Sequence, residues 1–161
     1  AAQTTRSGRI AVLATEATAR SERLARLIRD HAANLDVRVV PCPGWATRVE
    51  TLQLDGPEFA AEVQAMLQPL LDHGVDRIVL GCTHYAFLAP LMTPAAQGRA
   101  ELIEVADAVA RQVVRQHGAE GGQATLHLEA TTRPERLAAA LPALGLQSLA
   151  ARVASVGQCH R

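Results

Sequence analysis

Short apolar runs rich in β-branched residues alternate along this chain with stretches that have helical periodicity. Three of these runs are Ile10–Ala14, Val37–Val40 and Ile78–Leu80, and each is typical of a strand buried on both faces of a parallel sheet. Strands that alternate with helices indicate an α/β fold with a mainly parallel sheet and flanking helices. We expect strands near residues 10–15, 37–41, 76–81, 100–104 and 124–129.

The helices should lie between these strands. We expect them over residues 19–33, from Pro57 to Gly74, and over residues 106–117 and 134–144. Proline in a first turn and glycine just past a last turn are common helix boundaries. In the helix at 106–117, the spacing of Val109, Val113 and Val114 predicts an apolar stripe that faces inward.

The composition excludes several classes of function. The chain has 161 residues, enough for one ordinary core, with 16 basic and 16 acidic side chains. A balanced charge gives no electrostatic reason to bind nucleic acid or an anionic membrane. No apolar run approaches the length of a membrane span, and there is no secretory signal pattern. Three widely spaced cysteines do not form a disulfide framework, which fits a reducing cytoplasm.

The sequence Gly81-Cys82-Thr83-His84-Tyr85 directly follows the strand expected at 76–81. Ligands of open α/β sheets bind just past the carboxyl ends of the strands. A thiol reacts as the thiolate, and a nearby histidine lowers its pKa. The alternative is that Cys82 is a small buried hydrophobe. Three polar groups at one strand end are costly unless they are satisfied or used, and this favours a functional site.

This motif resembles the second catalytic-cysteine motif of glutamate racemases, in the cofactor-independent aspartate/glutamate racemase superfamily. The family usually continues with proline, where this chain has Ala86. The resemblance extends from about Gly8 to Val156. It implies interconversion of L- and D-glutamate, supplying D-glutamate for peptidoglycan, with no cofactor and no metal.

The resemblance also implies how the chain is organised. Glutamate racemases are pseudo-symmetric two-domain proteins, and their first half carries Asp-Ser-Gly and Gly-Asn-Thr motifs that are absent here. The chain therefore resembles the C-terminal portion of such an enzyme. Residues 1–9 would be a tail or linker, 10–99 the second domain, and 100–161 the segment that returns to complete the first domain. The implied partners are glutamate and the missing N-terminal half, with a homodimer possible.

The family pattern assigns roles to the residues of the motif. Cys82 would carry a proton to and from one face of the substrate, most often the L-glutamate side. His84 would set the protonation state of Cys82 and contact the substrate. Thr83, with nearby backbone N–H groups, would hold a carboxylate.

Two threonines form a second candidate for substrate binding. Thr15 and Thr18 lie where the first strand turns into a helix, and the family has a similar Ala-Thr-x-Gly-Thr turn. Ala17 replaces the family glycine. Such a turn can bind an anion, although Thr18 or Ser21 can equally be a helix N-cap, and the spacing favours the cap.

Other side chains give weaker signals. Cys42 lies in the rigid loop Pro41–Gly44, where we expect a packed, structural thiol. Glu50 matches a family acid and is a minor catalytic candidate. Zinc is poorly supported, because Cys82-x-His84 has no second cysteine pair. The rival functions are an inactive fragment or binding module, and a single-cysteine relative such as a decarboxylase.

Overall fold

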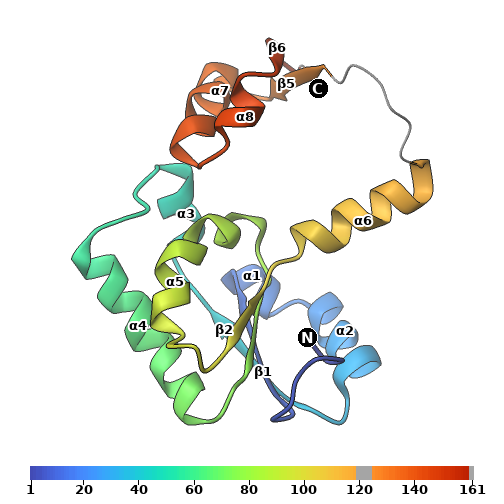
Figure 1. Ribbon diagram of the computed structural model, residues 1–161, viewed down its shortest axis with the longest axis vertical. Helices are drawn as coiled ribbons and strands as arrows, with labels where there is room; N and C mark the ends of the chain where they lie inside the picture. The colour runs from blue at the N-terminus through green and yellow to red at the C-terminus, as the bar shows by residue number, and fades with distance from the viewer. Residues whose placement is uncertain (119–124, 160–161) are drawn as a thin grey trace. The chain divides into compact units, whose positions relative to one another are not determined.

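The structure is a computed structural model that describes residues 1–118 and 125–159. The chain divides into two compact units, Ala1–Gln116 and His117–Arg161 (Figure 1), and each is described by itself. None of the helices in the described ranges is long and apolar enough to cross a membrane.

The first unit contains a parallel four-stranded sheet in the order β2-β1-β3-β4. Its strands are β1 (Arg9–Ala14), β2 (Asp36–Pro41), β3 (Arg77–Leu80) and β4 (Glu101–Ile103). At the centre, Val12 of β1 lies between Val39 of β2 and Val79 of β3. The α/β class and the parallel strands are therefore confirmed. Since β4 pairs with β3, the sheet extends past residue 99, and the first compact unit continues to Gln116.

Helices connect the strands on both sides of the sheet. They are α1 (Glu16–Ala19), α2 (Glu22–Ala32), α3 (Trp45–Glu50), α4 (Pro57–Asp72), the 3₁₀ helix η1 (Thr83–Leu88), α5 (Ala89–Ala95) and α6 (Ala106–His117). Figure 1 shows α2 on one side of the sheet and α4 with α5 on the other. The single helix expected over residues 19–33 is wrong at its start. Thr15 and Ser21 each cap a separate helix, because each side chain accepts a backbone N–H two or three residues into the turn.

The core lies mainly on the side of the sheet covered by α4. Leu13, Ile78 and Leu80 are at most 1% exposed, and they are complemented by the buried stripe of α4, which includes Val63 and Leu67. Successive residues of a strand point alternately toward α4 and toward α2, because side chains in a strand alternate between the two faces of the sheet.

The inward-facing stripe expected on α6 is wrong for this structure. Val109, Val113 and Val114 are 59%, 51% and 51% exposed. The periodicity that predicted the stripe is present, but no other element of the first unit makes an extensive contact with α6. The helix therefore has an amphipathic sequence whose apolar side is not covered by the other elements of residues 1–116.

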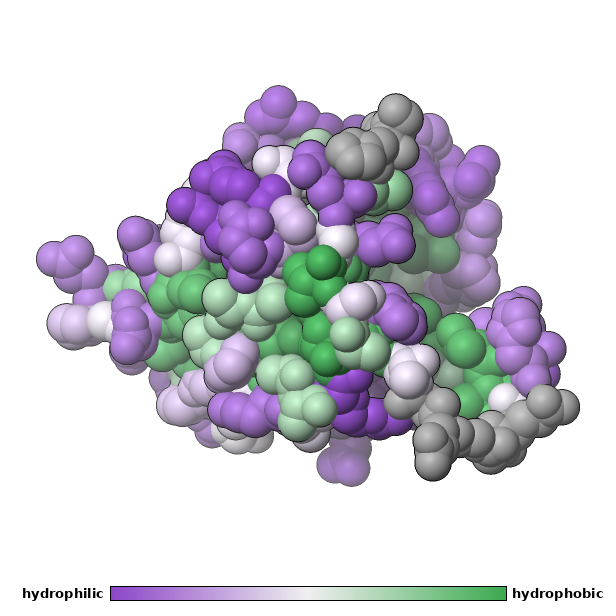
Figure 2. Space-filling model, turned by 90° about the horizontal axis from the view of Figure 1, so that it is seen from above, coloured by the Kyte–Doolittle hydropathy of each residue, from purple (hydrophilic) through white to green (hydrophobic). Residues whose placement is uncertain are grey.

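The second unit is a small β/α element. Its strands β5 (Leu126–Ala130) and β6 (Val153–Gln158) pair in parallel, and α7 (Pro134–Ala143) and α8 (Gln147–Ala150) lie between them in sequence. The strand expected near 124–129 is confirmed apart from residue 124, which lies outside the described residues, whereas β6 was not predicted. Among the described residues of this unit, Leu141 is the one buried hydrophobic residue, and Leu137, Leu149 and Val156 are exposed. Figure 2 shows hydrophobic residues among polar ones on the face of the molecule that it draws.

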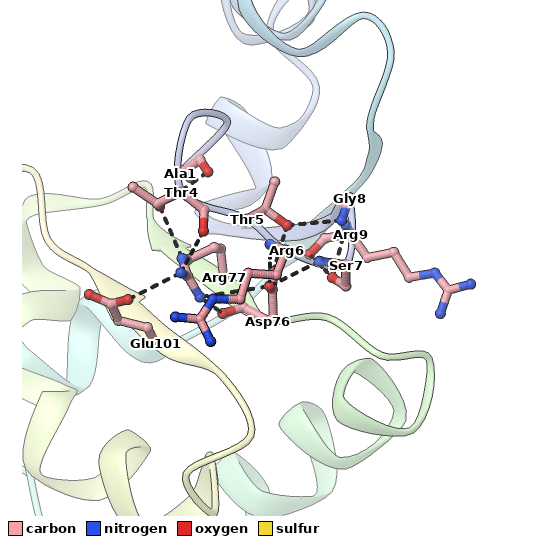
Figure 3. A network of polar contacts seen from close by, with 10 residues as sticks. All are labelled: Ala1, Thr4, Thr5, Arg6, Ser7, Gly8, Arg9, Asp76, Arg77 and Glu101. Atoms are coloured by element: carbon pink, nitrogen blue, oxygen red, sulfur yellow. Dashed lines mark hydrogen bonds and ion pairs between the residues drawn. The ribbon is translucent and has the colours of Figure 1, made fainter.

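Residues 1–9, expected to be a tail or linker, are fixed to the amino edge of the sheet by hydrogen bonds (Figure 3). The Asp76 carboxylate accepts from the Thr5 hydroxyl at 2.6 Å and from the backbone N–H groups of Arg6 and Ser7 at 2.7 and 3.1 Å. Arg77 donates to the Thr4 carbonyl at 2.6 Å. Desolvation alone would raise the pKa of Asp76, but the hydrogen bonds outweigh it and hold that pKa well below its usual range.

We predict that Asp76→Asn lowers the free energy of unfolding by about 1–3 kcal/mol at pH 7, because an amide nitrogen would face backbone donors. Since the pKa of Asp76 is depressed in the folded state, its stabilising contribution is complete above the unfolded pKa of about 3.9 and is lost as the pH falls toward the folded pKa. The difference between wild type and variant should therefore shrink below about pH 4. The free energies of unfolding can be measured by urea unfolding, followed by the fluorescence of Trp45, the single tryptophan.

The matched control is Asp30→Asn, on the exposed surface of α2. This control should change the free energy of unfolding by less than about 0.5 kcal/mol. Equal losses in the two variants, or a difference that persists undiminished to pH 2, would contradict the assignment.

Candidate functional site

The end of β3 packs so closely on β1 that glycine is required at position 81. The Gly81 N–H donates to the Leu13 carbonyl oxygen at 2.8 Å. A Cβ atom at this position would lie 2.8 Å from the same oxygen and 3.2 Å from a Val12 methyl group, closer than a carbon atom can come without displacing its neighbour. This contact places Cys82, the next residue, at the carboxyl edge of the sheet, as the sequence predicted.

Three side chains form a continuous line of polar contacts at this edge. The Cys82 Sγ lies 3.7 Å from His84 Nδ1, within reach of a hydrogen bond to sulfur. His84 Nε2 lies 2.5 Å from Glu50 Oε1. A carboxylate at Nε2 favours a proton on that nitrogen, which leaves Nδ1 as an acceptor for the thiol proton. Glu50, a minor candidate from sequence, thus contacts His84 directly.

The three side chains of this line differ in their exposure to solvent. His84 is 32% exposed and Glu50 is 68% exposed, so the contact between them is open to solvent, while Cys82 is half-buried. Transfer of the thiol proton to Nδ1 would create an imidazolium that the Glu50 carboxylate stabilises. The arrangement can therefore generate a thiolate and take its proton back.

Cys42 also follows a strand, but its surroundings suppress its chemistry. It is 1% exposed, and its Sγ lies 3.5 Å from Met66 Sδ and 3.6 Å from the Val40 carbonyl oxygen. Burial raises the pKa of the Cys42 thiol to about 12, because a thiolate loses its hydration there. The expected structural role fits this environment. Cys159, exposed, follows β6 in the second unit.

The three candidate threonines differ in their surroundings. The Thr15 hydroxyl caps α1 by accepting the Thr18 N–H at 3.3 Å, and it donates to the Thr18 hydroxyl at 3.0 Å. Thr83 is exposed at the start of η1. Thr18 and Thr83 line the same groove.

That groove, with a volume of about 710 Å³, lies over the face of the sheet beside α2. Its lining is mainly aliphatic, including Ile10, Val79 and Ile103, and it does not contain Cys82, His84 or Glu50. A substrate with two carboxylates and an ammonium group needs polar partners for each charge. The groove is therefore mainly apolar, and the polar side chains in its lining are Gln3, Thr18, Ser21, Arg23, His31 and Thr83.

Two side chains at the site were not predicted from sequence. Trp45 and Tyr85 are both fully buried and pack edge to face, with ring centroids 5.8 Å apart. The Tyr85 hydroxyl donates to the Cys42 carbonyl oxygen at 3.2 Å. A lone tryptophan directly after Cys-Pro-Gly was the available signal. Among the described residues, no group of three or more histidine, cysteine, aspartate or glutamate side chains could hold a metal ion.

The sequence matches the profile of the Asp/Glu/hydantoin racemase family over residues 1–113. The chain belongs to this family. The resemblance inferred from the Gly81–Tyr85 motif is thereby confirmed. A glutamate racemase from Pseudomonas aeruginosa UCBPP-PA14 is 38% identical over 149 residues, which cover 89% of this chain and 56% of that protein. A glutamate racemase from Stutzerimonas stutzeri is 36% identical over 148 residues, with the same coverage.

Solved structures of glutamate racemases share the fold. A Bacillus anthracis isoform superposes with a TM-score of 0.78 at 22% identity, covering 95% of this chain and 58% of that one. The Escherichia coli enzyme, solved with L-glutamate and the activator UDP-MurNAc-Ala, superposes with a TM-score of 0.70 at 21% identity. The match covers 98% of this chain and 60% of the Escherichia coli chain. The Francisella tularensis enzyme, solved with D-glutamate, superposes with a TM-score of 0.71 at 19% identity. The match covers 96% of this chain and 58% of the Francisella tularensis chain. The chain thus spans little more than half the length of the relatives it matches.

We predict that Gly81→Ala destabilises the first unit by about 1–3 kcal/mol, because the added methyl group must displace β1 or β3. Thermal unfolding followed by circular dichroism measures the change. Gly157→Ala is the control, since a Cβ atom there meets nothing within 4 Å. Equal unfolding temperatures for Gly81→Ala and wild type would show that the strands are not in close contact there.

We also predict that Cys82 reacts with limiting iodoacetamide faster than Cys42. Cys82 is half-buried beside His84, whereas Cys42 is buried and its pKa is raised to about 12. Peptide mass spectrometry of the three cysteine peptides reports the relative rates, and Cys159 serves as the exposed reference. Preferential labelling of Cys42 would move the reactive site to the Pro41–Gly44 loop.

Proposed function

We propose that this chain is the C-terminal portion of a glutamate racemase, an isomerase that interconverts L- and D-glutamate without a cofactor and supplies D-glutamate for peptidoglycan. The observation that carries the proposal is the Cys82–His84–Glu50 line at the carboxyl edge of the sheet, in a chain whose similar relatives are named glutamate racemases. Similar solved enzymes hold L-glutamate in one case and D-glutamate in another. The three free cysteines support a cytoplasmic location.

The proposed chemistry inverts the α-carbon with a proton carrier on each face. Cys82, as the thiolate, removes the α-proton on the L-glutamate side, and a second acid donates a proton from the opposite side. In the other direction the two groups exchange roles. His84 accepts the thiol proton of Cys82 before abstraction, which generates the thiolate, and Glu50 stabilises the resulting imidazolium. Each transfer requires the proton carrier within hydrogen-bond reach of the carbon.

Hydroxyl groups near Cys82 supply the proposed substrate contacts. Thr83 directly follows Cys82, and the Thr18 hydroxyl lies 3.0 Å from the hydroxyl of Thr15. Both can donate to a substrate carboxylate, and a hydrogen bond to a charged acceptor is stronger than a neutral one. Thr15 then has a supporting role, because it orients Thr18. His84 can contact the substrate from the same loop.

The second proton carrier is proposed to come from polypeptide outside this chain. Cys42 is buried with a raised pKa, and it lacks the partner base that Cys82 has. The exposed valines of α6 and the aliphatic groove beside α2 give this further polypeptide apolar surface to cover. An N-terminal half fits the difference in length between this chain and its relatives. A homodimer is the other candidate for these surfaces, and light scattering would reveal it as a doubled mass.

We predict no measurable conversion of L- to D-glutamate by residues 1–161 alone. Reprotonation must come from the face opposite to abstraction, and contacts that hold the substrate in register contribute much of the rate. Supplying a matching N-terminal half in trans should restore conversion, and Cys82→Ser should abolish it again, with a loss of at least about 10²-fold. The assays are circular dichroism of glutamate over time and α-deuterium uptake by NMR.

Cys159→Ser is the matched control, since it removes an exposed thiol outside the site and should leave the restored activity unchanged. Conversion by the isolated chain that persists in Cys82→Ser would contradict both the partial-enzyme proposal and the role of Cys82. Failure of every N-terminal half to restore activity would favour an inactive fragment. Release of carbon dioxide from an amino-dicarboxylate or malonate-type acid would favour a decarboxylase.

A further inference from the structure

Helix α3 ends at Glu50, which contacts His84, but the helix is too short to be stable without contacts to other elements. It has six residues and begins at Gly44, which provides no side-chain cap. Isolated helices of this length are unstable in water. The position of Glu50, the last residue of the helix, must therefore be fixed by contacts that α3 makes with other elements.

Trp45, the first residue of α3, makes the strongest of these contacts. Its side chain is fully buried and packs edge to face on Phe59 of α4, with ring centroids 5.7 Å apart. Its indole N–H donates to Glu62 of α4 at 2.7 Å. On another side it meets the ring of Tyr85. The beginning of α3 is thus held between α4 and η1.

Tyr85 also connects η1 to the loop that precedes α3. Its hydroxyl donates to the Cys42 carbonyl oxygen, two residues before the glycine at which α3 begins. Burial raises the pKa of Tyr85, so the hydroxyl stays protonated and keeps this bond. Tyr85 directly follows His84 in η1. Consecutive residues of η1 therefore contact both ends of α3, with Tyr85 at Trp45 and His84 at Glu50.

We propose that Tyr85, acting with Trp45, is a positioning residue that holds Glu50 against His84 and thereby sets the reactivity of the Cys82 thiol. The inference rests on the proposed function only in its premise that His84 tunes Cys82. The Tyr85 hydroxyl makes its hydrogen bond to the Cys42 carbonyl oxygen and not to the Cys82 thiol or the Glu50 carboxylate. Its effect passes through the placement of α3.

The geometry explains why a small displacement would matter. The Glu50–His84 contact of 2.5 Å joins a side chain that is 68% exposed to one that is 32% exposed. Water competes for both groups, so the bond survives only if α3 is already in place. A movement of about 1 Å would take the two atoms beyond hydrogen-bond distance. His84 would then lose the carboxylate that stabilises its protonated form.

Two other titratable groups lie close enough to Cys82 to interact with it, Cys42 and Tyr85. Burial raises the pKa of each, so both are neutral in the neutral pH range. The charged group in contact with His84 is Glu50.

The test measures the rate of Cys82 alkylation by iodoacetamide between pH 5 and 10, with peptide mass spectrometry, in the full 161-residue chain. Glu50→Gln should raise the midpoint pH of the rate profile by about one unit, which slows alkylation about tenfold below the midpoint. Tyr85→Phe, which removes only the hydroxyl, should shift the midpoint in the same direction by about half a unit, or about threefold in rate. Trp45→Leu, which removes the ring contacts, should also raise the midpoint pH.

The double variant Tyr85→Phe/Glu50→Gln decides between positioning and a general structural effect. If Tyr85 acts through Glu50, the double variant should react at the same rate as Glu50→Gln, within about twofold, because the two changes are not independent. Rate losses that multiply would overturn the inference. An unshifted profile in Tyr85→Phe would overturn it as well.

Val63→Ala is the matched control for lost stability. It creates a cavity under α4, at a fully buried residue away from η1, and should lower the unfolding temperature without moving the midpoint. A midpoint shift in this control equal to that in Tyr85→Phe would show that the effect is not specific, and would overturn the inference. Because thiol alkylation needs neither glutamate nor an N-terminal half, this result is independent of whether the chain supports racemisation.

Discussion

The close approach of β1 and β3 at Gly81 is the contact on which the candidate site depends. The Gly81 N–H bond to Leu13 ends the pairing of the two strands and leaves no room for a Cβ atom. The chain then turns at once into η1, so Cys82 and His84 emerge at the carboxyl edge. Parallel strands bring their carboxyl ends to the same edge, which is also where β2 ends and the loop to α3 begins.

The thiols of Cys42 and Cys82 follow β2 and β3, the strands on either side of β1, and they have different chemistry because of the side chains that surround them. Cys42 is enclosed by Met66 and its own strand end, and its environment favours the neutral thiol. Cys82 faces an imidazole that is backed by a carboxylate, which favours transfer of its proton. Position after a strand is therefore not enough to identify a reactive cysteine.

Features with a local period could be read from the sequence, and features made by distant residues could not. The strands of the parallel sheet and the edge position of Cys82 follow from runs of buried residues and were predicted correctly. The hydrogen bonds of Asp76 to residues 5–7 join segments about seventy positions apart, and no local sequence pattern predicts such bonds. The contact between Trp45 and Tyr85 is equally non-local. Strand β6, with sequence VASVGQ, alternates too weakly to be recognised.

The division into two units has a consequence for any energetic study of this chain. Among its described residues, the second unit buries one large hydrophobic side chain, Leu141, whereas the first unit buries a full core. Cooperative unfolding requires that elements share enough buried surface to melt together. Calorimetry of the whole chain should therefore give a van't Hoff enthalpy below the calorimetric one. No single melting temperature would then describe both units.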